Sequence, residues 1–396
     1  MTDVLSPNAT TGSGSNAAAD AGRAADGASD ETGGRVRLPV ASESADSSRY
    51  PFGIPFGWFQ VAWSGDLAVG DVLPRYYFGR HLVLWRDEEG VAHLNDAYCP
   101  HLGAHIAYGG HVDGCDLVCP FHGWQFDADG NNTEIPYGTR TNQKAKIRSY
   151  PVREIAGHFI TAWYHPYDEP PLYEIDEPAE CTDPEYGEWT TVHFAVAAAS
   201  QELAENSVDG PHFRYVHNTE IVPEIQSYEA EGWIARMRSV QQFPTPRGVV
   251  DGRIDVDNQG PGFGVTRFSG IVDTFLVGAA APVDANRCEV RFSFKTRSLG
   301  DATTTSNVGK AFVKEVCKQF EEDRPVWENK AHISRPALAD TDPPFMKFRK
   351  WYGQFYAEPV DKTDHVYGVP APDCEFQPPK FVRAQQTASA KHRQTD

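Results

Sequence analysis

Two short segments of the chain each place one cysteine close to one histidine. The first segment reads Cys99-Pro-His101, and the second reads Cys119-Pro-Phe-His122. The stretch between His101 and Cys119 is long enough to form a hairpin, which would bring the two segments face to face. Thiolate sulfur and imidazole nitrogen are ligands for transition metals, so we expect these side chains to bind a metal group together.

The mixture of ligand types within each segment bears on which metal group is bound. In a [2Fe–2S] cluster of the Rieske type, two histidines replace two cysteines on one iron, and this replacement raises the reduction potential. A structural zinc site is the alternative, but zinc sites more often pair two cysteines in one knuckle and two histidines on one helix. Because each segment mixes the two types, the sequence favours the cluster. Its predicted ligands are Cys99, His101, Cys119 and His122.

A second group of candidate ligands lies in Asn206-x-x-Asp209-Gly-Pro-His212-x-x-x-x-His217. On an ideal helix, a spacing of five residues turns the two histidine side chains more than about 100° away from each other. Binding of one metal by both would therefore require a break in the helix. Gly210-Pro211 supplies such a break, because proline lacks the N–H and glycine adopts unusual dihedral angles. The alternative is that both histidines are ordinary surface or core residues.

A carboxylate in a later helix would complete this second site. An apolar stripe at three-to-four spacing predicts an amphipathic helix, and Asp323 falls on the same stripe as Val308, Phe312, Val316, Phe320 and Trp327. A buried carboxylate is costly unless it is paired or binds a metal. The alternatives are an ion pair between Asp323 and an arginine such as Arg324, and Glu322 as the ligand instead. We favour a two-histidine-one-carboxylate iron site, with open positions for O2, formed by His212, His217 and Asp323.

Two further polar residues precede the histidines of this site. Asp209 lies one turn before His212, close enough to orient its imidazole by a hydrogen bond, and the alternative is a helix N-cap at the surface. Asn206 belongs to the same site or is a plain polar residue of the helix. Because the chain combines a predicted one-electron donor with an oxygen-binding iron, we interpret Asp209 and Asn206 as a catalytic polar bridge between the two centres.

The charge and cysteine content exclude several classes of protein. The 396 residues carry a formal net charge of −19 and supply no basic stripe, so we expect no nucleic-acid partner. No apolar run reaches about 18 residues, so we expect no integral membrane segment. The N-terminus lacks the pattern of a signal peptide, and the seven cysteines are too few and too scattered for a disulfide framework. These features favour a cytoplasmic protein.

The order of predicted elements indicates an α+β protein with two domains. Residues 1–48 contain no aromatic residue, and we expect a disordered N-terminal tail. A first, small all-β domain is predicted over residues 49–168, with strands at Phe59–Trp63, Arg75–Phe78, His81–Trp85 and Phe159–Trp163. A second domain over residues 169–383 combines a mostly period-two pattern from Tyr228 to Arg297 with the long helix that carries Asp323. A flexible tail is expected over residues 384–396.

One strand of the second domain shows the period-two pattern clearly. Cys288, Val290, Phe292 and Phe294 alternate with Glu289, Arg291, Ser293 and Lys295. Such alternation predicts an antiparallel strand that is buried on one face and exposed on the other.

Taken together, these motifs resemble the oxygenase component of the Rieske non-heme iron oxygenases over Tyr50 to Tyr356. That family has a Rieske domain followed by a helix-grip domain, in which an antiparallel sheet wraps a long helix. Its motif Asn-x-x-Asp-x-x-His-x-x-x-x-His and its distant aspartate match Asn206, Asp209, His212, His217 and Asp323. The steroid-acting branch, 3-ketosteroid 9α-hydroxylases and cholesterol 7-desaturases, is similar in Cys99–His105, Ile135–Tyr137, Phe320–Asp323 and Trp351–Tyr356.

The resemblance implies a terminal oxygenase that uses O2 and electrons from an NAD(P)H-linked reductase, with or without a ferredoxin, to hydroxylate a steroid-like or other polycyclic apolar substrate. It further implies an apolar pocket lined by the sheet from Trp233 to Phe294. It also implies a head-to-tail homotrimer, in which Asp209 joins His212 to His122 of the partner subunit. A desaturase with the same metal sites is the nearest alternative. An electron-transfer or lipid-binding protein that keeps the cluster but lacks the second iron is an alternative of another class.

Overall fold

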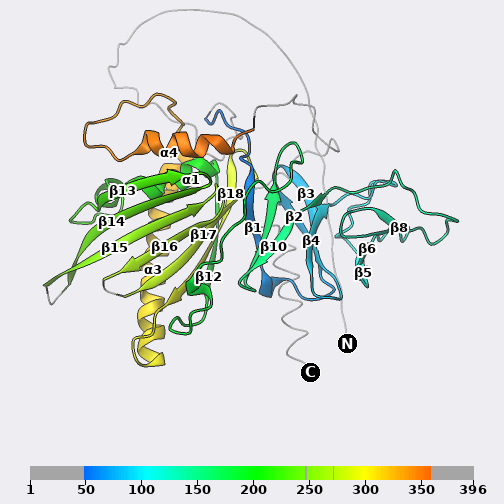
Figure 1. Ribbon diagram of the computed structural model, residues 1–396, viewed down its shortest axis with the longest axis horizontal. Coiled ribbons are helices and arrows are strands. Elements are labelled where there is room, and N and C mark those ends of the chain that lie inside the picture. Colours follow the sequence, from blue (N-terminus) through cyan, green and yellow to red (C-terminus); the bar gives the residue numbers. More distant parts are fainter. Residues whose placement is uncertain (1–48, 246–247, 271, 358–396) are drawn as a thin grey trace, which may run out of the picture. The chain divides into compact units, whose positions relative to one another are not determined.

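The computed structural model of the chain describes residues 49–357, apart from residues 246, 247 and 271 (Figure 1). The predicted tails 1–48 and 384–396 lie outside the described residues, as does Cys374. All of the described residues belong to one unit, Pro39–Asp396. No helix in the described part of the chain combines the length and the apolar composition that crossing a bilayer requires.

Short antiparallel strands form the N-terminal part, as the alternating patterns predicted (Figure 1). One sheet has the order β1 (Gly57–Trp63), β11 (Phe159–Tyr164), β10 (Val152–Ile155). A second has the order β2 (Val72–Tyr77), β3 (Arg80–Arg86), β4 (Ala92–Asp96), β9 (Ser149–Tyr150). A third has the order β5 (His111–Asp113), β6 (Asp116–Val118), β7 (Gln125–Phe126), β8 (Asn132–Glu134). The predicted hairpin between the two cysteine segments is the β5–β6 pair.

The C-terminal part is one seven-stranded antiparallel sheet with a long helix packed on it. The strand order is β12 (Thr190–Val196), β18 (Arg287–Thr296), β17 (Thr274–Asp284), β16 (Gly264–Ser269), β15 (Gly248–Gln259), β14 (Ile234–Thr245), β13 (Glu224–Glu231). Helix α3 (Ala302–Asn329) begins after Asp301, whose carboxylate accepts from the Thr304 N–H. Phe320 and Trp327 pack from α3 against the sheet. The predicted fold class, with an antiparallel sheet around a long helix, is confirmed.

The prediction that β18 is exposed on one face is wrong. Arg291, Ser293 and Lys295 on its polar face are buried. Arg291 donates to the Tyr77 hydroxyl at 2.7 Å, and the Trp63 indole donates to Ser293 Oγ at 2.8 Å. The N-terminal strands therefore cover this face and satisfy its polar groups, which is why polar side chains persist at buried positions. Alternating apolar and polar residues show that the two faces of a strand differ in chemistry. In β18 both faces are nevertheless buried.

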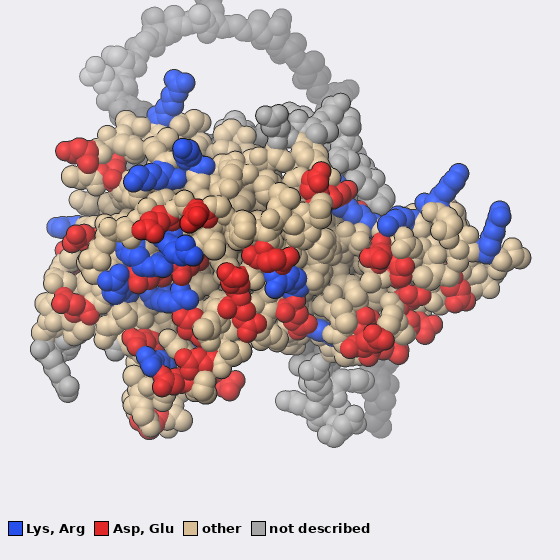
Figure 2. Space-filling view, viewed as in Figure 1, with Lys and Arg blue, Asp and Glu red and all other residues tan. Residues whose placement is uncertain are grey.

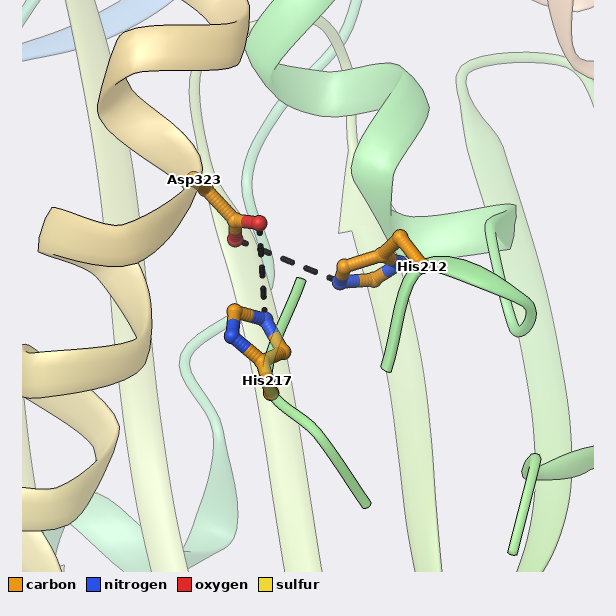
Figure 3. Close-up of side chains that lie close together, drawn as sticks. All are labelled: His212, His217 and Asp323. Carbon is orange, nitrogen blue, oxygen red and sulfur yellow. Dashed lines mark ion pairs between the residues drawn. The ribbon is translucent and has the colours of Figure 1, made fainter. Parts of the chain in front are cut away.

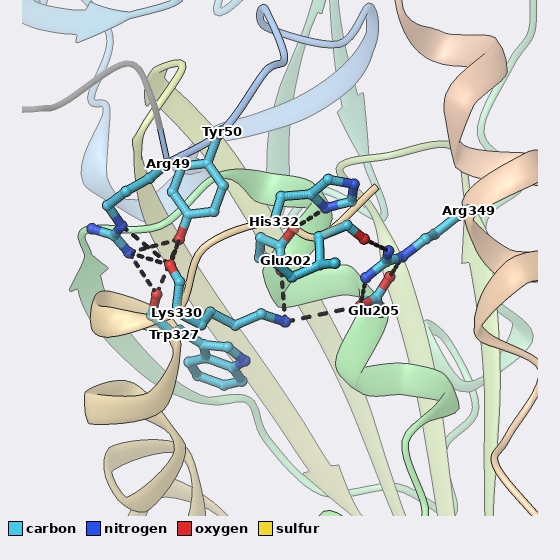
Figure 4. Close-up of polar contacts among 9 residues, drawn as sticks. Arg49, Tyr50, Glu202, Glu205, Trp327, Lys330, His332 and Arg349 are labelled. Atoms are coloured by element: carbon cyan, nitrogen blue, oxygen red, sulfur yellow. Dashed lines mark hydrogen bonds and ion pairs between the residues drawn. The ribbon is translucent and has the colours of Figure 1, made fainter. Parts of the chain in front are cut away.

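Helices α1 (Ser200–Glu205), α2 (His212–Tyr215) and α4 (Phe345–Tyr352) complete the described regular structure, together with the 3-10 turns η1 (Ser64–Asp66), η2 (Ala179–Cys181), η3 (Asn206–Val208) and η4 (Gly353–Phe355). A network of buried charges fixes α1 (Figure 4). The Glu202 carboxylate lies 2.6 Å from Lys330 Nζ and 2.8 Å from His332 Nδ1, and Glu205 pairs with the Arg349 guanidinium at 2.8 Å. Lys330 directly follows α3 and Arg349 lies on α4, so these pairs tie α1 to both helices.

Candidate metal centres

The two cysteine segments fold into matching loops. In each loop the cysteine N–H donates to the carbonyl five residues later, and the cysteine carbonyl accepts from the glycine N–H four residues later. The pairs are Cys99–Ala104 and Gly103–Cys99 in the first loop, and Cys119–Trp124 and Gly123–Cys119 in the second, at 2.8–3.0 Å. Gly103 and Gly123 both have a positive φ, 74° and 69°, which glycine adopts without strain. The same backbone geometry is therefore built twice.

The four predicted cluster ligands lie at the ends of these loops. Cys99 and Cys119 are buried and share a hydrogen bond between their thiols, which raises the pKa of Cys99 and lowers the pKa of Cys119 to about 6. Backbone N–H groups within each loop point at the sulfur atoms, as expected around cluster ligands. The rings of His101 and His122 are less buried and lie 4.7 Å apart. Trp124 stacks on the His101 ring at 4.5 Å.

The spacing of these donors distinguishes a two-iron cluster from a single zinc ion. One tetrahedral zinc would hold all of its ligand atoms within about 4 Å of one another. Here the Cys99 and Cys119 thiols share a hydrogen bond, and the His101 and His122 rings form a second pair with centroids 4.7 Å apart. A pair of sulfurs beside a separate pair of imidazoles instead fits a [2Fe–2S] cluster, with one pair on each iron.

The second candidate centre begins where α1 ends. The chain passes through η3 and then extends at Asp209, with φ −96° and ψ 96°, before the single turn of α2 starts at His212. A side chain at Gly210 would approach the Pro223 carbonyl oxygen to 2.9 Å, so this crossing requires glycine. The predicted break at Gly210-Pro211 is therefore present. A second break, at the end of α2 after Tyr215, turns His217 back toward His212.

Figure 3 shows His212, His217 and Asp323 converging from α2, the following loop and α3. His217 Nε2 lies 3.4 Å from Asp323 Oδ1, and His212 Nε2 lies 4.0 Å from Asp323 Oδ2. One ligand atom from each residue lies within 4.8 Å of the other two. All three side chains are at most 9% exposed, so the site is shielded from bulk water.

The outer nitrogens of both imidazoles already have partners. His212 Nδ1 lies 2.5 Å from the Asp209 backbone carbonyl, and His217 Nδ1 lies 3.0 Å from Glu322 Oε2. A carbonyl or carboxylate oxygen only accepts, so Nδ1 carries the proton in each ring and Nε2 presents a lone pair toward Asp323. Two lone pairs facing a carboxylate form the donor set for a cation, and these residues fit a ferrous ion.

The contacts of Asp323 decide between the alternatives for this carboxylate. Arg324 pairs with Glu321 and Glu328 and does not contact Asp323. Asn206 Nδ2 instead donates to Asp323 Oδ2 at 3.2 Å. Glu322 lies behind His217, on its Nδ1, while Asp323 faces Nε2. For His217, the effect of burial, which lowers the pKa, is outweighed by the two carboxylates, which raise it.

Asp209 contacts His212 in a different way from the hydrogen bond that the sequence suggested. Its backbone carbonyl holds the imidazole, whereas its carboxylate accepts from the His212 backbone N–H at 3.3 Å. The second contact is that of an N-cap, so both interpretations of Asp209 describe part of the geometry. The carboxylate is still 30% exposed, which leaves it accessible to a group from outside the chain.

A cavity of about 250 Å³ opens beside these three residues. The sheet, α3 and the α1–α2 segment line it, and most of the lining is apolar; representative residues are Ile254, Val256, Phe268, Leu276, Val290 and Phe292. The predicted limits of the pocket, Trp233 and Phe294, do not line it. Gln319 also lines the cavity and was not among the site residues predicted from the sequence. Its position four residues before Asp323, on the same helix face, was a signal that could have found it.

Known proteins match nearly all of the described chain. Residues 57–151 match the model of the Rieske [2Fe-2S] domain, and residues 162–356 match the 3-ketosteroid 9alpha-hydroxylase C-terminal domain. A cholesterol 7-desaturase of Bombyx mori is 30% identical over 349 residues, which cover 83% of this chain and 75% of that protein. A probable 3-ketosteroid-9-alpha-monooxygenase oxygenase component of Rhodococcus rhodochrous is 29% identical, covering 77% and 80%.

Solved structures share the fold at lower identity. The NdmA QL mutant of Pseudomonas putida CBB5 with theobromine superposes with a TM-score of 0.62 at 19% identity, covering 78% of this chain and 97% of that one. Dicamba monooxygenase bound to dicamba gives a TM-score of 0.57 at 20% identity, covering 76% and 96%. The assignment to a family rests on three findings: the matching loops at one centre, the buried donor set for a cation at the other, and these relatives. The chain belongs to the Rieske non-heme iron oxygenases, as an oxygenase component with a [2Fe–2S] cluster and a mononuclear iron.

Proposed function

We propose that this chain hydroxylates a steroid-like or other polycyclic apolar substrate with O2. The observation that carries the proposal is that His212, His217 and Asp323 line a cavity whose other walls are mostly apolar. A cavity of this kind fits a substrate with few polar groups. Relatives named for 3-ketosteroids and for cholesterol support the same substrate class.

The proposed ligands divide between the two centres as the sequence predicted. Cys99, His101, Cys119 and His122 would hold the cluster, and His212, His217 and Asp323 would hold the iron. When bound, the iron activates O2 and the cluster supplies electrons one at a time. The carbonyl of Asp209 and the carboxylate of Glu322 fix the two imidazoles, and Asn206 fixes the Asp323 carboxylate. The apolar walls keep water away from the substrate C–H bond.

Electrons would come from an NAD(P)H-dependent reductase, with or without a ferredoxin, because the chain is an oxygenase component. This carrier would dock outside Leu102 and Phe121 of the cluster loops, exposed side chains that the trimer proposed below would cover. Figure 2 shows Lys and Arg interleaved with Asp and Glu over β14 to β16 on the face drawn, where Arg238 and Arg267 both pair with Asp257.

We further propose a homotrimer in head-to-tail contact. None of the four cluster ligands is among the residues that line the cavity of the same chain. Exposed Tyr215 and Ile221 lie near Asp209, and exposed Leu102 and Phe121 lie in the cluster loops. A heterologous ring would cover both patches and bring Asp209 to His122 of the partner subunit. Light scattering of the full chain tests this proposal, and a monomer at micromolar concentration would contradict it.

Location and domain limits also remain proposals. Besides the two proposed cluster ligands, four cysteines within residues 49–357 are free, and unpaired thiols are typical of a reducing, cytoplasmic environment. We keep residues 49–168 as the Rieske domain and residues 169–383 as the catalytic domain.

The decisive experiment is product analysis with the iron-loaded full chain, a surrogate reductase, NADH and O2. A panel of sterols, 3-ketosteroids and other polycyclic hydrocarbons should give one hydroxylated product with stoichiometric O2 use. A product with a new double bond would assign the desaturase reaction instead, a candidate favoured by the similarity to cholesterol 7-desaturases. No oxidised product from any apolar compound in the panel would contradict the proposed substrate class.

A further inference from the structure

The cavity beside the iron site contains several polar side chains, and most of them already have partners. Asn206 donates to Asp323, and Asn258 donates to Ser207 Oγ at 3.2 Å. The Ser239 hydroxyl donates to the Ile254 carbonyl at 2.7 Å. The donor groups of these residues are therefore used in holding the walls of the cavity together.

Gln319 differs from these residues. It lines the cavity from α3, one helical turn before Asp323, and its side chain is partly buried. Within the described residues, its amide makes no hydrogen bond, ion pair or ring contact. A ligand that enters the cavity would displace water from this amide, so a ligand that supplies a hydrogen-bond partner would bind more tightly than one that does not.

One row of the sheet lines the same cavity as Gln319. Asn258, Gly264 and Gly278 are neighbours in register on β15, β16 and β17, and all three line the cavity. Gly278 pairs with Phe292 on β18, whose ring lies 5.2 Å from that of Phe320, the residue after Gln319. The Asn258 side chain lies beside Gly264 and the Phe292 ring lies beside Gly278, so these side chains line the same cavity as Gln319.

We propose that the Gln319 amide is the specificity-determining polar contact for the oxygen function of an otherwise apolar polycyclic substrate bound in this cavity. The amide donates from Nε2 to a ketone or accepts at Oε1 from a hydroxyl, so it fits either group. Because Gln319 is one turn from Asp323, about 6 Å along the helix axis, the oxidised carbon lies near the oxygenated ring and far from an alkyl tail. This inference rests on the proposed substrate class.

The test is equilibrium binding of three ligands to the iron-loaded full chain. Binding is measured by the change in tryptophan fluorescence or by calorimetry. The ligands are cholesterol, its 3-ketone and the 3-deoxy hydrocarbon, and the variant is Gln319→Met, which keeps the length and removes the amide. We expect affinity for at least one oxygenated ligand to fall about tenfold, while affinity for the deoxy compound stays constant or rises. Iron content and the cluster spectrum confirm that the variant is folded.

Two control variants make the outcome specific. Thr266→Val removes a cavity hydroxyl that, like the Gln319 amide, has no partner among the described residues. Gln143→Met removes an exposed amide in the N-terminal part. Unchanged discrimination in Gln319→Met, or equal losses for all three ligands, would overturn the inference. A loss that appears in Thr266→Val instead would also overturn it. If the wild-type chain bound none of the three ligands, the substrate class itself would be wrong, and this inference would fall with it.

Discussion

The predicted ligands of the cluster come from two loops joined by one short hairpin. The predicted ligands of the iron come from α2, the loop after it, and α3, and the strands β13 to β18 lie between that loop and α3 in the sequence. The cluster loops are fixed by hydrogen bonds within each loop. The iron site depends on where α1, α3 and α4 lie relative to one another. The first centre is therefore a local structure that the sheets only carry, and the second is a product of the whole catalytic fold.

Removal of the carboxylate should separate the two centres most completely. In Asp323→Ala we expect loss of the mononuclear iron and a fall in turnover of at least about 1000-fold, because two imidazoles alone hold the metal poorly. The cluster absorption should stay unchanged. Iron counting should then give about two irons per chain, against about three in the wild type. Glu321→Ala, an exposed neighbour on α3, is the matched control, and an active Asp323→Ala variant would refute the triad.

Asp209→Ala tests the connection between the centres. We expect both metals to be retained, since the His212 imidazole contacts the backbone carbonyl of Asp209, which the substitution keeps. Turnover should nevertheless fall by about 100-fold, because the carboxylate is the proposed bridge to the partner subunit. Stopped-flow reduction of the cluster followed by its reoxidation measures the step directly. A normal rate of cluster reoxidation would contradict the proposed bridge. Asp340→Ala, which changes an exposed aspartate, is the control.

Lys330→Met tests the dependence of the iron site on distant contacts. The substitution removes the ammonium group that pairs with the buried Glu202 carboxylate. Because a buried charge is then left without this partner, the free energy of unfolding should fall by about 3 kcal/mol. Since α1 leads directly into Asn206 and Asp209, iron retention during dialysis should also weaken, whereas the cluster spectrum should not change. Lys314→Met, which removes an exposed lysine of α3, should alter neither quantity. Equal loss of both metals would show that the two centres are not independent.

The smallest effect concerns acid stability on the cluster side. Burial, with a smaller effect of His81, lowers the pKa of His105 to about 4, below the usual value of 6.5. The unfolded chain therefore binds this proton first as the pH falls, so stability is present above pH 6.5 and is lost toward pH 4. Between pH 7 and pH 5 the loss should be about 1 kcal/mol, allowing for partial exposure.

Denaturant unfolding at the two pH values measures this loss. His105→Gln should reduce the pH dependence, and His111→Gln, an exposed histidine in the same part of the chain, should leave it unchanged. An identical slope in His105→Gln and the wild type would show that other groups carry the acid sensitivity.

The sequence predicted what short-range spacing controls. Mixed cysteine and histidine segments with a proline and a glycine indicated the cluster loops, and the α3 stripe placed Asp323 on a buried face, because helical periodicity depends only on the order of residues. The period-two pattern also predicted β18, although it did not reveal that the polar face of this strand is buried by a neighbouring sheet.

Only the tertiary structure decided the long-range contacts. It showed that Glu322 and the Asp209 carbonyl take the outer nitrogens of the imidazoles, that Glu202 holds α1 against Lys330, and that Gln319 lines the cavity beside the iron site. Most of these contacts join residues that are far apart in the chain. The contact between Asp209 and His212 is local, but it depends on how the chain turns between η3 and α2. Periodicity and spacing carry no information about such contacts, because packing between elements fixes them.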